Sequence, residues 1–211
     1  MLPEGNSSTP PLAEALIGPG FYKLGYVTTD LEQAIDLFTR TLGFGAFARF
    51  APSMEVTTGD GKRGPASLRC AFSTGRELVV ELMQPLDGLV DVFREPLATA
   101  DEFAIAFHHT GILVDDLERV KAQLPTNPAW ESWLPGRMGV AYTRIPALGH
   151  YVEHVEYRGD GGDFLASVRN RAQTSPASPP RPRARPGGHL DEGRQRHPLA
   201  GLWFRAPGSV S

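Results

Sequence analysis

The sequence predicts an α+β fold in which two paired βαβββ modules form one cup-shaped mixed sheet. Three observations lead to this prediction. A ten-residue pattern occurs twice, as KLGYVTTDLE at 23–32 and as HTGILVDDLE at 109–118. Each copy begins with strand-like residues and continues into a stretch with helical periodicity. Three short strand candidates follow each copy, so the order of the elements repeats together with the motif.

The first module covers about 20–86 and begins with the aromatic and β-branched residues of FYKLGYVTT. Asp30 can cap the helix that follows, and Gly43 ends it. The apolar residues of this helix recur at helical spacing and predict one buried stripe: Leu31, Ala34, Ile35, Phe38 and Leu42. Strand candidates follow at 46–50, 66–73 and 76–84, with a turn-rich loop at 58–64.

The second module covers about 103–160, after a linker from about 87 to 101 that is expected to carry a short helix. FAIAFHHTGILV is strand-like, and DDLERVKAQL is helical, with Leu117, Val120 and Leu124 on one face. Strand candidates lie at 129–134, 139–145 and 150–157. Similar modules of this size pair to cover each other's apolar surface, so 20–170 is predicted to be one domain.

Both ends of the chain differ from this domain in composition. Residues 1–19 contain Pro, Gly, Ser and Asn and are expected to form a flexible leader. Residues 171–211 are rich in Pro and Arg and show no apolar periodicity. Such a segment cannot bury enough surface to order itself, so it is predicted to be a disordered tail. An arm for an anionic partner is the functional alternative.

Composition also narrows the classes of partner. The net charge of -3 among 211 residues gives no case for a nucleic-acid partner. Cys70 is the only cysteine, which excludes an internal disulfide and favours a reducing cytoplasm. The N-terminus lacks the pattern of a signal peptide, and no apolar run has the length of a membrane span. The expected partner is therefore a small molecule, with no membrane and no nucleic acid.

Aligning the two modules brings polar residues into matching positions. Lys23 matches His109 on the first strand of each module, and Glu81 matches Glu153 on the last strand. Strand side chains alternate between faces, so Glu81 faces away from the helix side, and Tyr151 shares the face of Glu153. If the modules pair by a pseudo-twofold axis, the four matched positions converge on the concave side.

One histidine and two carboxylates make a first shell for a divalent metal that keeps open positions. Such a metal polarises a carbonyl oxygen, and one carboxylate can act as general base. Simpler interpretations stay open, because Glu81 and Glu153 could face solvent at a sheet edge and His109 could be a core histidine. Four further residues alternate away from the site and are expected at the surface or in packing: His108, His150, His154 and Glu156. Three aromatic residues are expected to line an apolar pocket or to pack in the core: Trp130, Trp133 and Tyr142.

Four segments in this order resemble the vicinal oxygen chelate superfamily: LGYVTTDLEQAIDLFTRTLGF, VVELMQP, HHTGILVDDLE and LGHYVEHVEY. This group includes glyoxalase I, methylmalonyl-CoA epimerase, extradiol dioxygenases, and fosfomycin and bleomycin resistance proteins. The resemblance covers about 20–170 and implies metal ligands at Glu81, His109 and Glu153, with Glu153 and Glu81 also catalytic. It implies a divalent metal such as Zn, Ni, Mn or Fe, with Lys23 and Tyr151 lining the site.

Lys23 departs from that pattern, which has Gln or His at this position. A protonated lysine has three donors and no lone pair, so it cannot bind a metal. Either the metal binds through the other three residues with Lys23 turned aside, or the ammonium takes the metal's place between Glu81 and Glu153. A neutral, metal-bound lysine would need a large fall in its pKa.

Two functions of different classes follow. The first is a glyoxalase-like, metal-dependent lyase or isomerase that acts on a small carbonyl or thioester compound by proton transfer. The alternative is a metal-free protein that binds a small ligand, as antibiotic-sequestering relatives do. A dioxygenase is less favoured, because those enzymes use two histidines and one carboxylate and only His109 is well placed. Whether the chain forms a homodimer, as relatives often do, is left open by the sequence.

Overall fold

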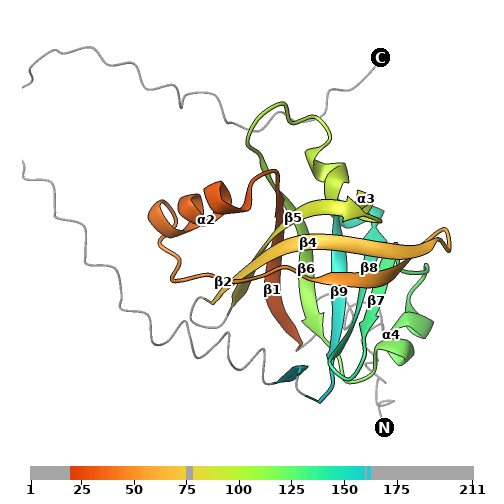
Figure 1. Ribbon diagram of the computed structural model, residues 1–211. Helices are drawn as coiled ribbons and strands as arrows, with labels where there is room; N and C mark the ends of the chain where they lie inside the picture. Colours follow the sequence, from red (N-terminus) through yellow and green to blue (C-terminus); the bar gives the residue numbers. More distant parts are fainter. Residues whose placement is uncertain (1–19, 75–77, 160, 163–211) are drawn as a thin grey trace, which may run out of the picture. The chain divides into compact units, whose positions relative to one another are not determined.

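The computed structural model describes residues 20–74, 78–159 and 161–162 (Figure 1). The predicted leader at 1–19 and tail at 171–211 lie outside these residues. Within them, nine strands form one mixed sheet in the order β2-β4-β3-β7-β8-β9-β6-β1-β5, with a further pairing of β4 and β5 that curves it into a cup. The strands are β1 (Phe21–Thr28), β2 (Ala48–Phe50), β3 (Ser53–Thr58), β4 (Arg63–Thr74), β5 (Val79–Gly88), β6 (Ile105–Leu113), β7 (Trp130–Leu134), β8 (Met138–Ile145) and β9 (His150–Tyr157).

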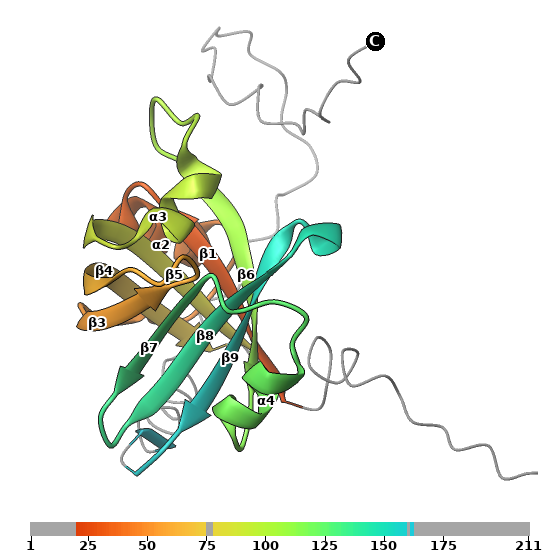
Figure 2. The ribbon, with the colours of Figure 1, turned by 90° about the vertical axis from the view of Figure 1, so that its right-hand side faces the viewer.

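The two halves of the sheet pair in the same way, which confirms the predicted fold of two βαβββ modules. β1 runs parallel to β5 in the first half, and β6 runs parallel to β9 in the second. The halves meet where β1 pairs antiparallel with β6, and again where β3 pairs antiparallel with β7. Figure 2 shows β7, β8 and β9 of the second half beside β6. The first strands of the two halves are therefore direct neighbours.

The helix of each half follows its first strand: α2 (Leu31–Arg40) in the first and α4 (Leu117–Gln123) in the second. The Asp30 carboxylate accepts the Gln33 backbone N–H and caps α2, as predicted. Leu31, Ala34, Ile35 and Phe38 are buried against Val80 and Leu82 of β5 and Ala71 of β4. Leu42 is 56% exposed, which corrects its place in the stripe, because the helix ends before it and Gly43 turns the chain at a φ of 75°.

Two strands of the first half differ from the prediction. β3 (Ser53–Thr58) was missed, although it is the strand that pairs with β7 of the other half. The candidate at 46–50 is only the short β2, an addition to the βαβββ order. β3 also forms a hairpin with β4, but only Val56 among its 6 residues is buried, so its apolar alternation is weak.

The linker between the halves contains the expected short helix, α3 (Asp91–Arg94), followed by the 3-10 turn η1 (Glu95–Leu97). A second 3-10 turn, η2 (Pro146–Leu148), precedes β9. No helix among the described residues is long and apolar enough to cross a membrane. Phe93 of α3 is fully buried, so the linker helix belongs to the core that lies inside the cup.

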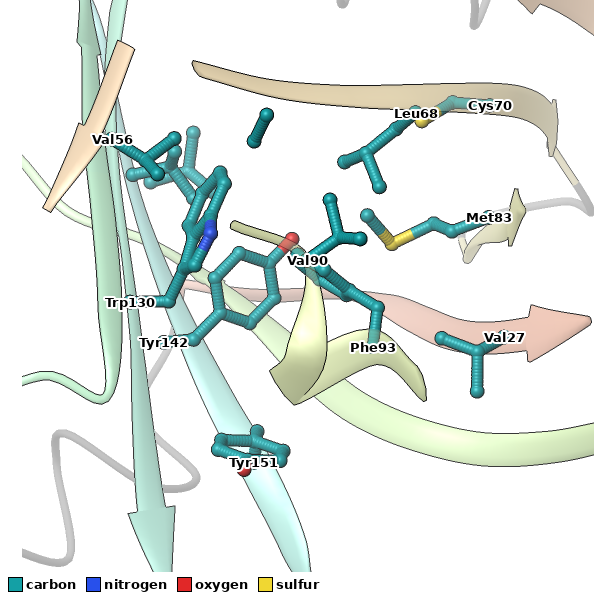
Figure 3. Packing of buried hydrophobic residues seen from close by; sticks show 13 residues of the cluster. Val27, Val56, Leu68, Cys70, Met83, Val90, Phe93, Trp130, Tyr142 and Tyr151 are labelled. Atoms are coloured by element: carbon teal, nitrogen blue, oxygen red, sulfur yellow. The ribbon is translucent and has the colours of Figure 1, made fainter. Parts of the chain in front are cut away.

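The largest apolar cluster lies on the concave side of the sheet (Figure 3). Phe93, Trp130 and Tyr142 meet edge to face, with ring centroids 5.2 to 5.5 Å apart. Met83, Leu68 and Cys70 belong to the same cluster and come from the first half. Residues of both halves thus share one core, which fixes the two first strands against each other.

Candidate functional site

Four matched polar residues lie on the four neighbouring strands β5, β1, β6 and β9. Gly25 of β1 is the register partner of both Glu81 and His109. Gly111 of β6 is the register partner of both Lys23 and Glu153. The repeated pattern thus places a polar residue and a glycine two positions apart on each first strand. Each polar residue lies beside the glycine of the other strand.

The two glycines make room for these side chains. A methyl group on Gly25 would come within 1.8 Å of the His109 ring. A methyl group on Gly111 would lie 2.8 Å from Lys23 Cε and 3.1 Å from Glu153 Oε2. Real Cβ atoms essentially never approach neighbours within 3.0 Å, so a side chain at Gly25 or Gly111 would force these neighbours to move. The glycines at 25 and 111 are therefore part of the site, which the sequence reasoning did not recognise.

The Lys23 ammonium lies between the two carboxylates. Its Nζ donates to Glu81 Oε2 at 2.6 Å and contacts Glu153 Oε2 at the same distance. His109 Nε2 is 3.4 Å from Glu81 Oε2 and 3.6 Å from Glu153 Oε2. All four residues are at most 4% exposed. The structure thus brings together Lys23, Glu81, His109 and Glu153, which the register of the two modules had matched.

Electrostatics keeps Lys23 and Glu81 charged. Burial by itself would lower the pKa of Lys23, but the carboxylates of Glu153 and Glu81 outweigh it and raise the pKa well above its ordinary value. Burial would raise the pKa of Glu81, but Lys23 and His109 lower it to about 2. Tyr142 donates its hydroxyl to Glu153 Oε1 at 2.7 Å. Lys23 is therefore an ammonium and Glu81 a carboxylate at neutral pH.

His108 precedes His109 in the sequence and orients the His109 ring. The register of β1 and β6 shifts between Gly25 and Tyr26, which leaves His108 without a partner on β1 and forms a bulge. His108 therefore does not alternate away from the site as expected. Its ring packs on Phe93 and stacks on Tyr151 inside the cup.

The hydrogen bonds of His108 set the tautomer of its neighbour. Its Nε2 lies 3.1 Å from the Val92 carbonyl oxygen, so this nitrogen carries the proton. Its Nδ1 lies 2.9 Å from His109 Nδ1 and must accept the hydrogen from that ring. The Nδ1 side of the His109 ring is thus fixed toward His108, and its Nε2 faces the carboxylates of Glu81 and Glu153. His108 is a positioning residue that the sequence marked only by the doublet HH.

An apolar cavity opens above the charged group, with about 530 Å³ of space that includes the part open to solvent. Lys23, Glu81 and Glu153 are the charged residues among the described residues that line it. The walls are apolar or aromatic and include Phe50, Phe72, Trp130 and Tyr142, with Met54, Met83 and Met138 among the rest. This lining, with apolar walls around a few charged groups, is typical of a pocket for a small organic ligand.

Two aromatic residues of the prediction lie elsewhere. Tyr151 is not among the described residues that line the cavity, which corrects its expected place. Its hydroxyl donates to Glu95 Oε2 at 3.0 Å, on the side of α3 and η1. Trp133 is 36% exposed and lies under the Arg158 guanidinium, 4.6 Å from the ring centroid. Trp130 and Tyr142 both pack in the core and line the cavity.

The donor atoms of the site are of the right kind for a divalent metal. One ligand atom each from Glu81, His109 and Glu153 lies within 4.8 Å of the others, so this group can hold an ion. The carboxylate oxygens nearest to His109 Nε2 are, however, the two that already contact Lys23 Nζ. A divalent ion and an ammonium cannot share these oxygens in a buried site. A metal ion therefore does not fit while Lys23 stays in this position.

Several solved structures resemble the chain at low identity. Methylmalonyl-CoA epimerase from Mycobacterium tuberculosis is 19% identical, with a TM-score of 0.45, and the match covers 70% of this chain and 91% of that one. A hypothetical protein from Bacillus halodurans is 16% identical, with a TM-score of 0.42 and coverage of 65% and 94%. A variant of 4-hydroxymandelate synthase from Streptomyces coelicolor is 12% identical, with a TM-score of 0.41 and coverage of 72% and 53%.

A family model gives the decisive comparison. No curated protein sequence matches the chain. The model of the glyoxalase/bleomycin resistance protein/dioxygenase superfamily matches residues 22–141, which is more than half of the chain. This span includes the first three site residues and ends before Glu153. The resemblance inferred from the motifs is confirmed, and the chain belongs to the glyoxalase/bleomycin resistance protein/dioxygenase superfamily.

Proposed function

We propose that the cup binds a small, mostly apolar carbonyl or thioester compound and that a carboxylate at its closed end transfers a proton beside the carbonyl group. One observation carries the proposal: Glu81, Glu153 and Lys23 line an otherwise apolar cavity, and His109 lies against both carboxylates. Membership in the superfamily supports an isomerase-like or lyase-like activity at a general level.

Glu153 and Glu81 are the groups able to accept such a proton. Both line the cavity, and both are anchored by defined partners. Glu153 is held by the Tyr142 hydroxyl at one oxygen and by Lys23 at the other, whereas Glu81 is held by Lys23 and His109. Anchored carboxylates in a mostly apolar pocket keep their geometry toward a bound ligand, as general-base catalysis requires.

A second candidate function is binding without a reaction. The low pKa of Glu81 makes its carboxylate a weak base. Met54, Met83 and Met138 line the cavity, and flexible methionine side chains adapt to ligands of different shape. These features favour a protein that sequesters an apolar compound.

Proton exchange tests the proposal whatever the net reaction is. The full chain is incubated in D2O with methylmalonyl-CoA or with the hemithioacetal of phenylglyoxal and glutathione, and NMR follows deuterium at the carbon beside the carbonyl. We expect exchange that falls at least about 100-fold in Glu153→Gln, the usual size of a general-base effect. Glu55→Gln, an exposed change on β3, is the matched control and should exchange like the wild type.

Fluorescence of Trp130 and the other tryptophans separates the two candidate functions. Saturable quenching by these compounds with no exchange above the rate in buffer would favour sequestration and count against proton transfer. Neither quenching nor exchange with any compound of this class would contradict the proposed ligand class.

A further inference from the structure

We propose that the Lys23 ammonium takes the position of a metal ion in this site, so that the centre carries a fixed positive charge of its own and works without a bound metal. The inference concerns the centre of the proposed function, but it rests on ion-pair geometry and not on any reaction. It gives a role to the one site residue that departs from the family pattern.

The position of the ammonium carries the argument. Nζ lies 2.6 Å from Glu81 Oε2 and 2.6 Å from Glu153 Oε2. These oxygens come from the last strands of opposite halves, and they are the two nearest to His109 Nε2. A divalent metal would bond the same oxygens at about 2.0–2.2 Å. The cation between the carboxylates of this chain is therefore an ammonium.

The lysine side chain is held in place along its length. The missing side chain at Gly111 leaves the space for Lys23 Cβ and Cε. The rings of Phe72 and Tyr22 lie near the ammonium, with centroids 5.4 and 5.6 Å from Nζ. Lys23 is 2% exposed, so turning it aside would strip two buried carboxylates of their partner. Such a loss costs several kcal/mol in proteins, which disfavours turning Lys23 aside unless another cation takes its place.

Charge balance distinguishes this centre from a metal centre. A divalent ion would neutralise Glu81 and Glu153 completely, whereas one ammonium leaves one negative charge on this pair of carboxylates. The Tyr142 hydroxyl shares that charge by donating to Glu153. With Lys23 between the carboxylates, the cavity end is thus a hydrogen-bonded ion-pair group without a Lewis-acid position that a ligand oxygen could occupy.

Metal content of the purified full chain tests the inference. Wild type, Lys23→Gln, Lys23→Met and Lys62→Gln are loaded with Ni²⁺, Zn²⁺, Mn²⁺ or Fe²⁺, desalted, and measured by mass spectrometry. We expect wild type and Lys62→Gln, an exposed control, to retain almost no metal. We expect Lys23→Gln to retain close to one equivalent, because it adds an amide oxygen and removes the competing charge. Lys23→Met, which adds no ligand, should retain less than Lys23→Gln.

Thermal unfolding supplies a second measurement. The Tm of Lys23→Gln should rise with added Ni²⁺ or Zn²⁺, while the wild-type Tm should not change. If Lys23→Gln folds only when metal is present during refolding, that result supports the inference equally. If it does not fold at all, NMR of wild type labelled with ¹⁵N-lysine decides. A slowly exchanging ammonium signal that shifts in Glu153→Gln, and not on adding Zn²⁺, supports it.

Three results would overturn the inference. One is a wild type that retains about one equivalent of metal and loses it in Glu153→Gln. Another is a folded Lys23→Gln that binds no metal, since the lysine would then not be what keeps metal out. The third is an ammonium signal that zinc displaces. None of these results depends on proton exchange of a carbonyl compound. The proposed function can therefore fail while this inference holds, and this inference can fail while the proposed function holds.

Discussion

In the first half of the sheet the repeated pattern begins with Lys23, and in the second half it begins with His109, at the same place on the matching strand. The residues around them also correspond: Gly25 with Gly111, and Glu81 with Glu153. The backbone plan is shared, whereas the side chain that enters the centre differs. Pseudo-symmetry of the chain thus produces a site that is chemically asymmetric.

The glycines explain why the comparison is so close. Gly25 accommodates the His109 ring, and Gly111 accommodates the Lys23 stem, so each half provides space for the other half's polar residue. Lys23 with Gly25 and His109 with Gly111 therefore form one packing arrangement across β1 and β6. What differs is the side chain: the first half contributes a fixed cation, and the second contributes an imidazole ring held by His108.

Replacing the lysine should have the largest effect on stability. Lys23→Met leaves two buried carboxylates unpaired and should lower the free energy of unfolding by about 3–5 kcal/mol in urea titration at pH 7. His109→Gln, the counterpart in the second half, removes no permanent charge and should cost less. Adding Glu81→Gln and Glu153→Gln to Lys23→Met should recover most of the loss. Equal losses for Lys23→Met and His109→Gln would contradict the charge difference between the halves.

The pH dependence of stability should have the opposite sign in Lys23→Met and in the wild type. In the wild type the pKa of Glu81 is lowered to about 2, so the stability it contributes is present above its unfolded value of 4.5 and lost as pH falls toward 2. In Lys23→Met the unpaired buried carboxylates have raised pKa values, so stability should increase as pH falls from 7 to 5. Urea midpoints at both pH values check the sign.

The glycine positions give the next largest effect. Gly25→Ala places a methyl group 1.8 Å from a ring that His108 and Tyr142 hold in place, and should cost about 3 kcal/mol, at the upper end of overpacking. Gly111→Ala meets a flexible lysine stem and should cost about 1–2 kcal/mol. Gly45→Ala, with no neighbour within 4 Å, is the control. Denaturant unfolding that ranks Gly111→Ala above Gly25→Ala would refute this comparison.

Replacing His108 should change the stability of the protein in acid, whereas replacing its counterpart Tyr22 should not. Burial and the neighbouring His109 lower the pKa of His108 from 6.5 to about 3. Below pH 6.5 the unfolded chain therefore binds a proton that the folded chain does not, and stability falls by about 1 kcal/mol per pH unit toward pH 3. His108→Gln should flatten this slope in urea titrations at pH 7 and 5, whereas Tyr22→Phe should leave it unchanged. An unchanged slope in His108→Gln would show that other groups cause it.

The helix caps should show the smallest effect and the closest agreement between halves. Asp30 caps α2 and Asp116 caps α4 by the same bond to a backbone N–H three residues on. Asp30→Ala and Asp116→Ala should each lower Tm by a few degrees. Leu117 N–H also donates to Glu156 Oε2, so α4 should tolerate the loss slightly better. Calorimetry of the two variants measures the difference.

Much of the fold and of the centre was predictable from the chain. The repeat located both first strands and both helices, and alternation on β5 and β9 directed Glu81 and Glu153 to the concave side. Strand β3 was missed because only Val56 among its 6 residues is buried, which leaves a weak apolar alternation. The position of His108 was not predicted because a bulge interrupts strict alternation. Tyr151 points toward Glu95 because η1 lies beside it.

The sequence by itself determined which residues correspond between the halves, because periodicity and caps are local properties of the chain. Only the tertiary structure decided what these residues do together. Whether Lys23 turns aside or pairs with Glu81 and Glu153 depends on the space at Gly111 and on the distances across four strands. Those distances follow from the pairing of β1 with β6, and a long-range pairing leaves no trace in the local pattern of either strand.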